Sequence, residues 1–107
     1  MKRLALVTAL FLGLGQTAWA DVETGIQAYQ RDDYPTAYRE WKPLAEKGDP
    51  AAQYNLGLLY HFGLGVRRDE GEAAKWYGLA AEQGDADAQH AIGDFYIEGL
   101  WGKPDYA

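Results

Sequence analysis

The chain contains no cysteine and no serine among its 107 residues. The missing cysteine excludes disulfides and the lipid-attachment site of a bacterial lipoprotein, and the two absences together exclude a serine-type or cysteine-type hydrolase. Thr24 and Thr36 are the threonines that remain after residue 20, and both lie near expected helix starts, where capping explains them. We therefore predict that the chain is not an enzyme and needs no cofactor.

Alternation of apolar and polar residues with a period of two is also missing, so no strand is predicted. Helix signals recur instead, with aspartate before each apolar stripe and glycine after several of them. Five helices are expected: Val22 to Arg31, from the Asp33 cap to about Lys47, from the Asp49 cap to Phe62, from the Asp69 cap to Gly84, and from the Asp85 cap to Glu98. The predicted fold class is all-α.

The first twenty residues resemble a secretory signal peptide. Lys2 and Arg3 precede an uncharged apolar run from Leu4 to Leu14, and Ala18-Trp19-Ala20 is a small-x-small cleavage site. The run of 11 residues is shorter than the roughly 20 needed to span a bilayer. We therefore expect cleavage before Asp21, no stable membrane anchor afterwards, and a periplasmic or secreted product.

Acidic residues dominate the rest of the chain. Because both basic residues of the signal segment are removed, 8 Lys and Arg remain against 16 Asp and Glu, a net charge of −8. This balance repels nucleic acid and anionic lipid, so neither is an expected partner.

The chain repeats itself at an offset of 36 residues. Between residues 49–69 and 85–105 eight of 21 positions are identical, and between residues 33–49 and 69–85 six of 17 are identical. A repeat of this length is one supersecondary unit that buries its apolar face by stacking on a neighbour. Proteins of this kind usually bind other proteins.

The run Ala51-Ala52-Gln53-Tyr54-Asn55-Leu56-Gly57-Leu58-Leu59-Tyr60, followed by Gly63-Leu64-Gly65-Val66, Asp69 and Ala80-Ala81-Glu82-Gln83-Gly84-Asp85, resembles the Sel-one-like (Sel1-like) repeat, a relative of the tetratricopeptide repeat. This resemblance implies an α-solenoid of antiparallel helix pairs, about two and a half repeats long. The expected divisions are a signal peptide (1–20), a compressed first tetratricopeptide-like helix pair (21–49), a complete repeat (50–85) and a truncated repeat (86–107).

The resemblance also implies an exported adaptor or scaffold whose first helices line a concave groove for a protein or peptide. The partner-binding residues carried over are Tyr29, Tyr54, Leu58, His61, His90, Asp94 and Ile97, with Phe62 and Glu98 at the groove edge. Helical periodicity independently places most of them beside the packing stripe. Packing between neighbouring repeats is the alternative role for Tyr54, Leu58 and Ile97.

Metal and acid–base chemistry are the alternatives that the histidines and carboxylates raise. His90 and Asp94 have the i, i+4 spacing of one helix face, and His61 on the neighbouring repeat would complete three ligands. Zinc sites normally have tighter ligand spacing and supporting groups, so we expect no metal site. Most paired carboxylates stand at helix starts, where they cap free N–H groups, and no catalytic residue is predicted.

Two other interpretations stay open. Trp76, Trp101 and the tyrosines could stack on sugar rings, which would make the chain a cell-wall glycan-binding or hydrolase-like factor. The chain could also be a non-functional fragment of a longer repeat protein, because it stops where a helix to cover residues 86–98 would begin. In that case self-association through the uncovered last helix is expected.

Overall fold

The computed structural model describes residues 22–98, and within this range the chain forms five helices and no strand. The first helix spans residues 22–30. The others are α2 (Tyr34–Glu46), α3 (Pro50–Phe62), α4 (Glu70–Glu82) and α5 (Ala86–Glu98). The predicted all-α class is confirmed. The predicted signal peptide lies outside the described residues, as do Trp101 and the turn after Glu98.

An aspartate caps each of the last four helices, because its side chain accepts a hydrogen bond from a backbone N–H three residues later. The donors are Thr36 to Asp33 (3.4 Å), Ala52 to Asp49 (3.1 Å), Glu72 to Asp69 (3.0 Å) and Ala88 to Asp85 (2.9 Å). Each cap is worth about 1 kcal/mol. Glu72 does not complete a capping box with Asp69. The Asp69 N–H donates to the Tyr60 carbonyl instead, and the Glu72 carboxylate accepts from Trp76 Nε1.

Glycine ends three of these helices in the left-handed conformation, with φ of 103° at Gly48, 66° at Gly63 and 94° at Gly84. The turn before α2 differs, because Asp32 takes the left-handed conformation there with φ of 63°. Aspartate tolerates this conformation better than most residues with a side chain. Residues 31–33 thereby close the first helix pair in a turn much shorter than residues 63–69 of the second pair.

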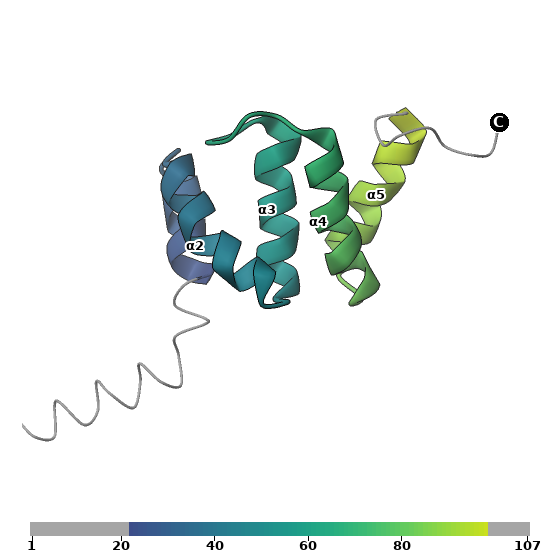
Figure 1. The fold of residues 1–107 in the computed structure, drawn as a ribbon, viewed down its shortest axis with the longest axis horizontal. Coiled ribbons are helices and arrows are strands. Elements are labelled where there is room, and N and C mark those ends of the chain that lie inside the picture. The colour runs from purple at the N-terminus through teal and green to yellow at the C-terminus, as the bar shows by residue number, and fades with distance from the viewer. Residues whose placement is uncertain (1–21, 99–107) are drawn as a thin grey trace, which may run out of the picture.

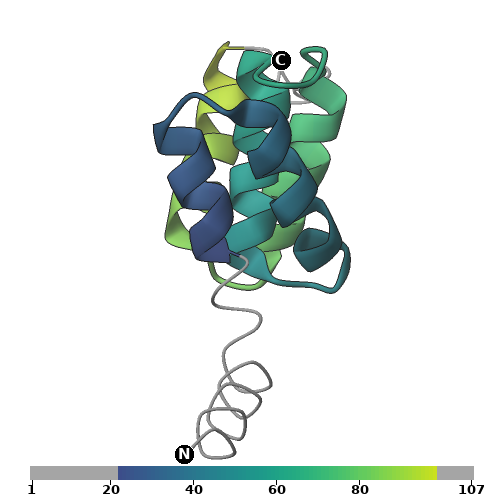
Figure 2. The same cartoon turned by 90° about the vertical axis from the view of Figure 1, so that its left-hand side faces the viewer.

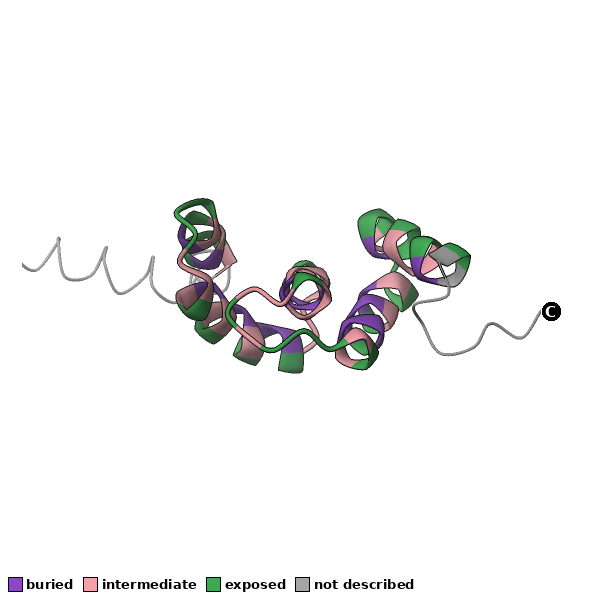
Figure 3. Ribbon diagram, turned by 90° about the horizontal axis from the view of Figure 1, so that it is seen from above, coloured by how far each residue is buried: buried purple, intermediate pink, exposed green. Residues whose placement is uncertain are grey.

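The helices stand side by side in chain order. Figure 1 shows α2, α3, α4 and α5 following one another along the longest axis, and Figure 2 shows the helix of residues 22–30 beside α2. Seen from above, they form an arc whose two arms are the helix of residues 22–30 and α5, with α3 between them on the inner side (Figure 3). No helix within residues 22–98 is long and apolar enough to cross a bilayer.

Two aromatic residues 36 positions apart, Trp41 of α2 and Tyr77 of α4, belong to the two core clusters and are buried. Each ring lies against a glycine of the helix before it. A Cβ on Gly25 would overlap the Trp41 indole, and a Cβ on Gly57 would lie 2.6 Å from the Tyr77 ring. The glycines therefore let the two helices of each pair approach closely.

The Gln53 side chain is polar and buried, and its hydrogen bonds connect neighbouring helix pairs. Its Nε2 donates to the Ala45 carbonyl at 3.1 Å, and its Oε1 accepts from Gln83 Nε2 at 2.9 Å. Gln89, which lies 36 residues after Gln53, donates in the same way to the Ala81 carbonyl at 3.1 Å. Gln53 and Gln89 are one of the eight identities at the 36-residue offset.

Candidate functional site

An uncharged pocket of about 280 Å³ lies between the helix of residues 22–30 and α3. The helix of residues 22–30 is one arm of the arc, and α3 lies on the inner side of the arc (Figure 3). We call this pocket the N-terminal pocket. Its lining residues are Ile26, Tyr29, Gln30, Trp41, Asn55 and Leu58. Trp41 is held at its base by a hydrogen bond from Nε1 to the Val22 carbonyl at 3.2 Å. Because no lining side chain carries a charge, the pocket suits an uncharged side chain of a ligand.

A second pocket of about 160 Å³ lies on the other side of α3, against α5. We call it the C-terminal pocket, and the two pockets together the inner groove. Its lining residues are Tyr54, Leu58, His61, Phe62, Tyr77, Asp87, His90, Ala91 and Asp94. Leu58 lines both pockets and therefore forms the ridge between them.

His61 is anchored among aromatic rings at the base of the C-terminal pocket. Its Nδ1 lies 3.1 Å from the Tyr77 hydroxyl. Its ring stacks on the Phe62 ring with 4.3 Å between the ring centroids, and it makes a T-shaped contact with the Phe95 ring with 4.7 Å between the centroids. Burial raises the pKa of Tyr77, so the hydroxyl keeps its proton. The imidazole is thus half-buried and structurally fixed, although one side of it still reaches the pocket.

The α5 wall of the C-terminal pocket is acidic. Asp87 and Asp94 lie on the same face of α5, two helical turns apart, with His90 between them. His90 Nε2 lies 3.6 Å from Asp94 Oδ2, and the His90 side chain is 82% exposed. The pKa of Tyr54 is raised, mainly by burial and then by the carboxylates of Asp87 and Asp85, which oppose its ionisation.

Six of the seven residues predicted to bind a partner line the inner groove. Tyr29 lies in the N-terminal pocket, Leu58 in both, and Tyr54, His61, His90 and Asp94 in the C-terminal pocket. Ile97 lines neither pocket and is 81% exposed. Phe62 lies at the pocket edge and is 59% exposed, whereas the Glu98 side chain is outside the described part of the chain. Their role in binding stays a prediction.

Seven groove residues were not predicted from the sequence: Ile26, Gln30, Trp41, Asn55, Tyr77, Asp87 and Ala91. A second offset would have revealed the first of them. Because the first turn is short, the helix of residues 22–30 aligns with α3 at an offset of 32, which pairs Gly25 with Gly57 and Ile26 with Leu58. Asp87 was assigned to helix capping alone, since it lies in the first turn of α5.

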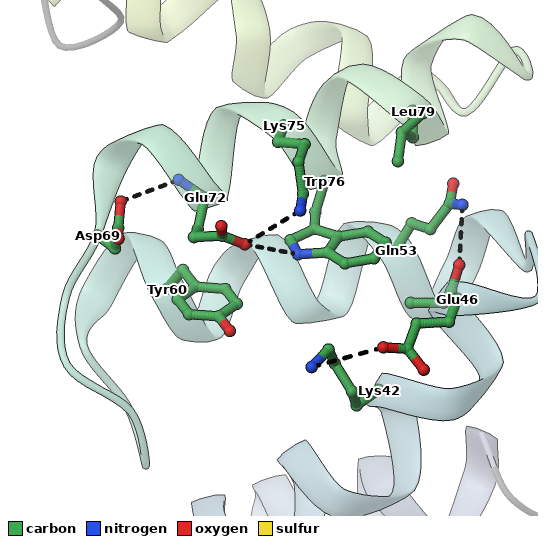
Figure 4. Close-up of a pocket in the computed structure, with 10 residues that line it drawn as sticks. Lys42, Glu46, Gln53, Tyr60, Asp69, Glu72, Lys75, Trp76 and Leu79 are labelled. Carbon is green, nitrogen blue, oxygen red and sulfur yellow. Dashed lines mark hydrogen bonds and ion pairs between the residues drawn. The ribbon is translucent and has the colours of Figure 1, made fainter.

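A larger cavity of about 780 Å³ opens on the outer side, between α2 and α4 (Figure 4). Its lining residues are Lys42, Ala45, Glu46, Gln53, Tyr60, Asp69, Glu72, Lys75, Trp76 and Leu79. Gln53 and Tyr60 lie on the side of α3 opposite to Leu58, so this outer cavity and the inner groove belong to different faces of the arc.

The charges of the outer cavity are paired with one another. Lys42 lies 3.6 Å from Glu46, and Lys75 lies 3.5 Å from Glu72. Lys42 also donates to the Tyr38 hydroxyl at 3.2 Å, and this bond raises the pKa of Lys42. These groups already have partners on the two helices that carry them, so the cavity offers a ligand little unpaired charge.

Trp76 does not offer a stacking surface for a sugar. The residue is only 6% exposed, its Nε1 donates to Glu72 at 3.2 Å, and Lys75 Nζ lies over its ring at 4.8 Å. Sugar stacking requires an open ring face, which Trp76 lacks. Metal binding through His61, His90 and Asp94 is likewise unsupported, because no group of three potential ligands within residues 22–98 is arranged to hold a metal ion.

Comparison with known proteins places these repeats in a family. The family model of the Sel1 repeat matches residues 50–85 and 86–107. An ERAD-associated E3 ubiquitin-protein ligase component of Arabidopsis thaliana is 39% identical over 56 residues, covering 51% of this chain and 8% of that protein. An exopolysaccharide production negative regulator of Rhizobium leguminosarum bv. viciae is 30% identical over 90 residues, covering 75% of this chain and 34% of that protein.

A solved structure agrees with the fold. It is the crystal structure of a protective antigen of uropathogenic Escherichia coli, which displays an SLR fold. The TM-score is 0.74 at 38% identity, and the match covers 81% of this chain and 20% of the antigen. The chain thus spans about a third or less of the length of these relatives.

Proposed function

We propose that this chain, which belongs to the Sel1 repeat family, binds a protein or peptide partner in its inner groove. Sel1 repeat proteins are generally protein-interaction scaffolds and typically have no enzymatic activity of their own. The plant relative is a component of a ubiquitin ligase, and another relative, from Rattus norvegicus, is a DAP3-binding cell death enhancer. Both relatives thus associate with other proteins.

The observation that carries the proposal is the difference between the two faces of the arc. The inner groove joins two pockets at Leu58 and displays aromatic and apolar side chains that no other part of residues 22–98 covers fully. The outer cavity is larger, but its lysines and glutamates neutralise one another within the chain. A partner protein therefore gains more binding free energy by covering the aromatic and apolar side chains of the inner groove than by covering the paired charges of the outer cavity.

Site-specific photo-crosslinking in the producing cells tests this proposal. A photoreactive phenylalanine analogue replaces His90 or Gln30 on the inner side, and Lys75 or Leu79 on the outer side, in the full chain. All four positions are solvent-exposed, so the fold should tolerate the change. We expect discrete protein adducts from His90 and Gln30, and several-fold weaker adducts from Lys75 and Leu79. Adducts of equal strength from both faces, or from the outer face alone, would overturn the proposal.

We further propose that the adaptor acts in the periplasm or outside the cell. The charged start, the apolar run and the Ala18-Trp19-Ala20 site support export. Fractionation of the producing cells, followed by mass measurement of the purified protein, tests this. A cytoplasmic product that retains Met1 to Ala20 would contradict export without affecting the groove.

A further inference from the structure

The inner groove is chemically asymmetric, and this asymmetry bears on the partner. The N-terminal pocket presents Ile26 and Tyr29 above the buried Trp41 indole, without any charge. The C-terminal pocket presents Asp87 and Asp94 along one wall. The complementary ligand is therefore apolar at one end and positively charged at the other.

The helix between the two pockets has no formal charge that would disturb this arrangement. Residues 50–62 of α3 contain no aspartate, glutamate, lysine or arginine. Two histidines line the C-terminal pocket: His90, whose Nε2 lies 3.6 Å from Asp94 Oδ2, and His61, whose Nδ1 lies 3.1 Å from the Tyr77 hydroxyl. Asp87 lines the pocket together with Tyr54. An incoming cation therefore meets two carboxylates and no competing lysine or arginine among the residues that line the pocket.

The spacing of the pockets limits the shape of the ligand. Leu58 lines both pockets, so the pockets adjoin, and the centres of two adjoining pockets of this size lie on the order of 10 Å apart. An extended segment in the polyproline II conformation rises by about 3.1 Å for each residue and has three residues per turn, so two side chains three residues apart lie on one face, about 9 Å from each other. An extended segment crossing α3 at Leu58 can then reach both pockets at once.

On the basis of the protein-binding function proposed above, we propose that the inner groove recognises an extended segment of a partner protein with one apolar side chain for the N-terminal pocket and one lysine or arginine for the Asp87 and Asp94 wall. The two side chains lie three residues apart, on one face of a segment in the polyproline II conformation. Leu58 packs against the backbone between them, and Asn55 supplies an amide for that backbone.

Titration of the full chain, labelled with nitrogen-15, against blocked eight-residue peptides tests the inference. The reference peptide has leucine and lysine three residues apart in a glycine and asparagine background. In three matched peptides lysine becomes glutamate, leucine becomes glycine, or the leucine–lysine separation becomes six residues. We expect the reference peptide to shift amide signals of α3 and α5 saturably, and each altered peptide to bind at least about threefold more weakly.

Charge variants of the chain locate the contact. Asp87→Asn and Asp94→Asn each remove one carboxylate from the groove while keeping the shape of the side chain, and Glu46→Gln removes one from the outer face. We expect each groove variant to weaken the reference peptide about two- to fivefold. Glu46→Gln should leave binding unchanged, which controls for the loss of net charge.

Equal affinity for the lysine and glutamate peptides, or an equal effect of Glu46→Gln and Asp94→Asn, would overturn the inference. Absence of any saturable shift in α3 and α5 would overturn it as well. The crosslinking result is independent of these peptides, so adducts from His90 and Gln30 would preserve the protein-binding function even after such a failure.

Discussion

Gly57 of α3 and Gly93 of α5 occupy the same position of the repeat, 36 residues apart, yet their surroundings differ. A Cβ on Gly57 would lie 2.6 Å from the Tyr77 ring, whereas a Cβ on Gly93 would meet no described atom within 4 Å. A glycine inside a helix costs about 1 kcal/mol relative to alanine. At Gly57 the close approach of α4 offsets that cost. Within residues 22–98 nothing offsets it at Gly93.

The same contact builds part of the inner groove. Because α4 approaches α3 closely at Gly57, the Tyr77 ring lies at the base of the groove. There its centroid lies 5.5 Å from the centroid of the Tyr54 ring, and its hydroxyl contacts His61 Nδ1. A glycine that recurs at one position of the repeat therefore has a packing role only where the next helix lies against it.

Tyr77→Ala is expected to have the largest effect. The residue is fully buried, so its removal leaves a cavity beside Gly57 and should lower the free energy of unfolding by about 3–5 kcal/mol. Urea unfolding of the full chain measures the change. Leu79→Ala on the same helix is the control, because its side chain is exposed and its loss should change stability by about 0.5 kcal/mol or less. Similar losses for the two variants would show that Tyr77 is not central to the core.

Gly57→Ala should come next. The added methyl group overlaps the Tyr77 ring, and overpacking of this kind costs about 1–3 kcal/mol. The control is Gly78→Ala in α4, where a Cβ has free space and alanine should stabilise the helix by up to about 1 kcal/mol. The two urea midpoints should therefore move in opposite directions. A stabilised Gly57→Ala would mean that α4 does not need the close approach.

Tyr77→Phe tests the polar part of the same contact. Burial raises the pKa of Tyr77 in the folded chain. The stability that the neutral Tyr77 phenol contributes is therefore complete below the unfolded tyrosine pKa of about 10, and it is lost as the pH rises above that value. The variant should lose about 1 kcal/mol at pH 7, because the hydrogen bond to His61 is gone. Above pH 10 its urea midpoint should fall less steeply than that of the wild type. Parallel curves would contradict a buried phenol.

The helices could be predicted from the sequence because their signals are local. Asp33, Asp49 and Asp69 make their caps with residues three positions away, and Gly48 and Gly63 supply the left-handed ends. These interactions need no knowledge of the tertiary structure. The groove residues on α3 could be predicted for a related reason, since helical periodicity alone separates Leu58 from the packing stripe.

Other features depend on neighbouring helices and could not be predicted. Tyr29, His61 and Ile97 share one position of the repeat, but Ile97 is exposed beyond the pockets, whereas His61 is fixed by Tyr77 and Phe95. Gln53 is polar and buried because its amide reaches a carbonyl of the preceding helix. Periodicity cannot distinguish such a residue from an exposed glutamine.

Gly93→Ala is expected to have the smallest effect, and one of opposite sign to Gly57→Ala. No described atom of residues 22–98 would lie within 4 Å of the new Cβ. Alanine should therefore raise the free energy of unfolding by about 0.5–1 kcal/mol, because its helix propensity is higher than that of glycine. Thermal unfolding of the full chain measures the gain, with Gly78→Ala as the matched reference. A loss comparable to that of Gly57→Ala would instead mean that a side chain covers this face of α5 in solution, as Tyr77 covers α3.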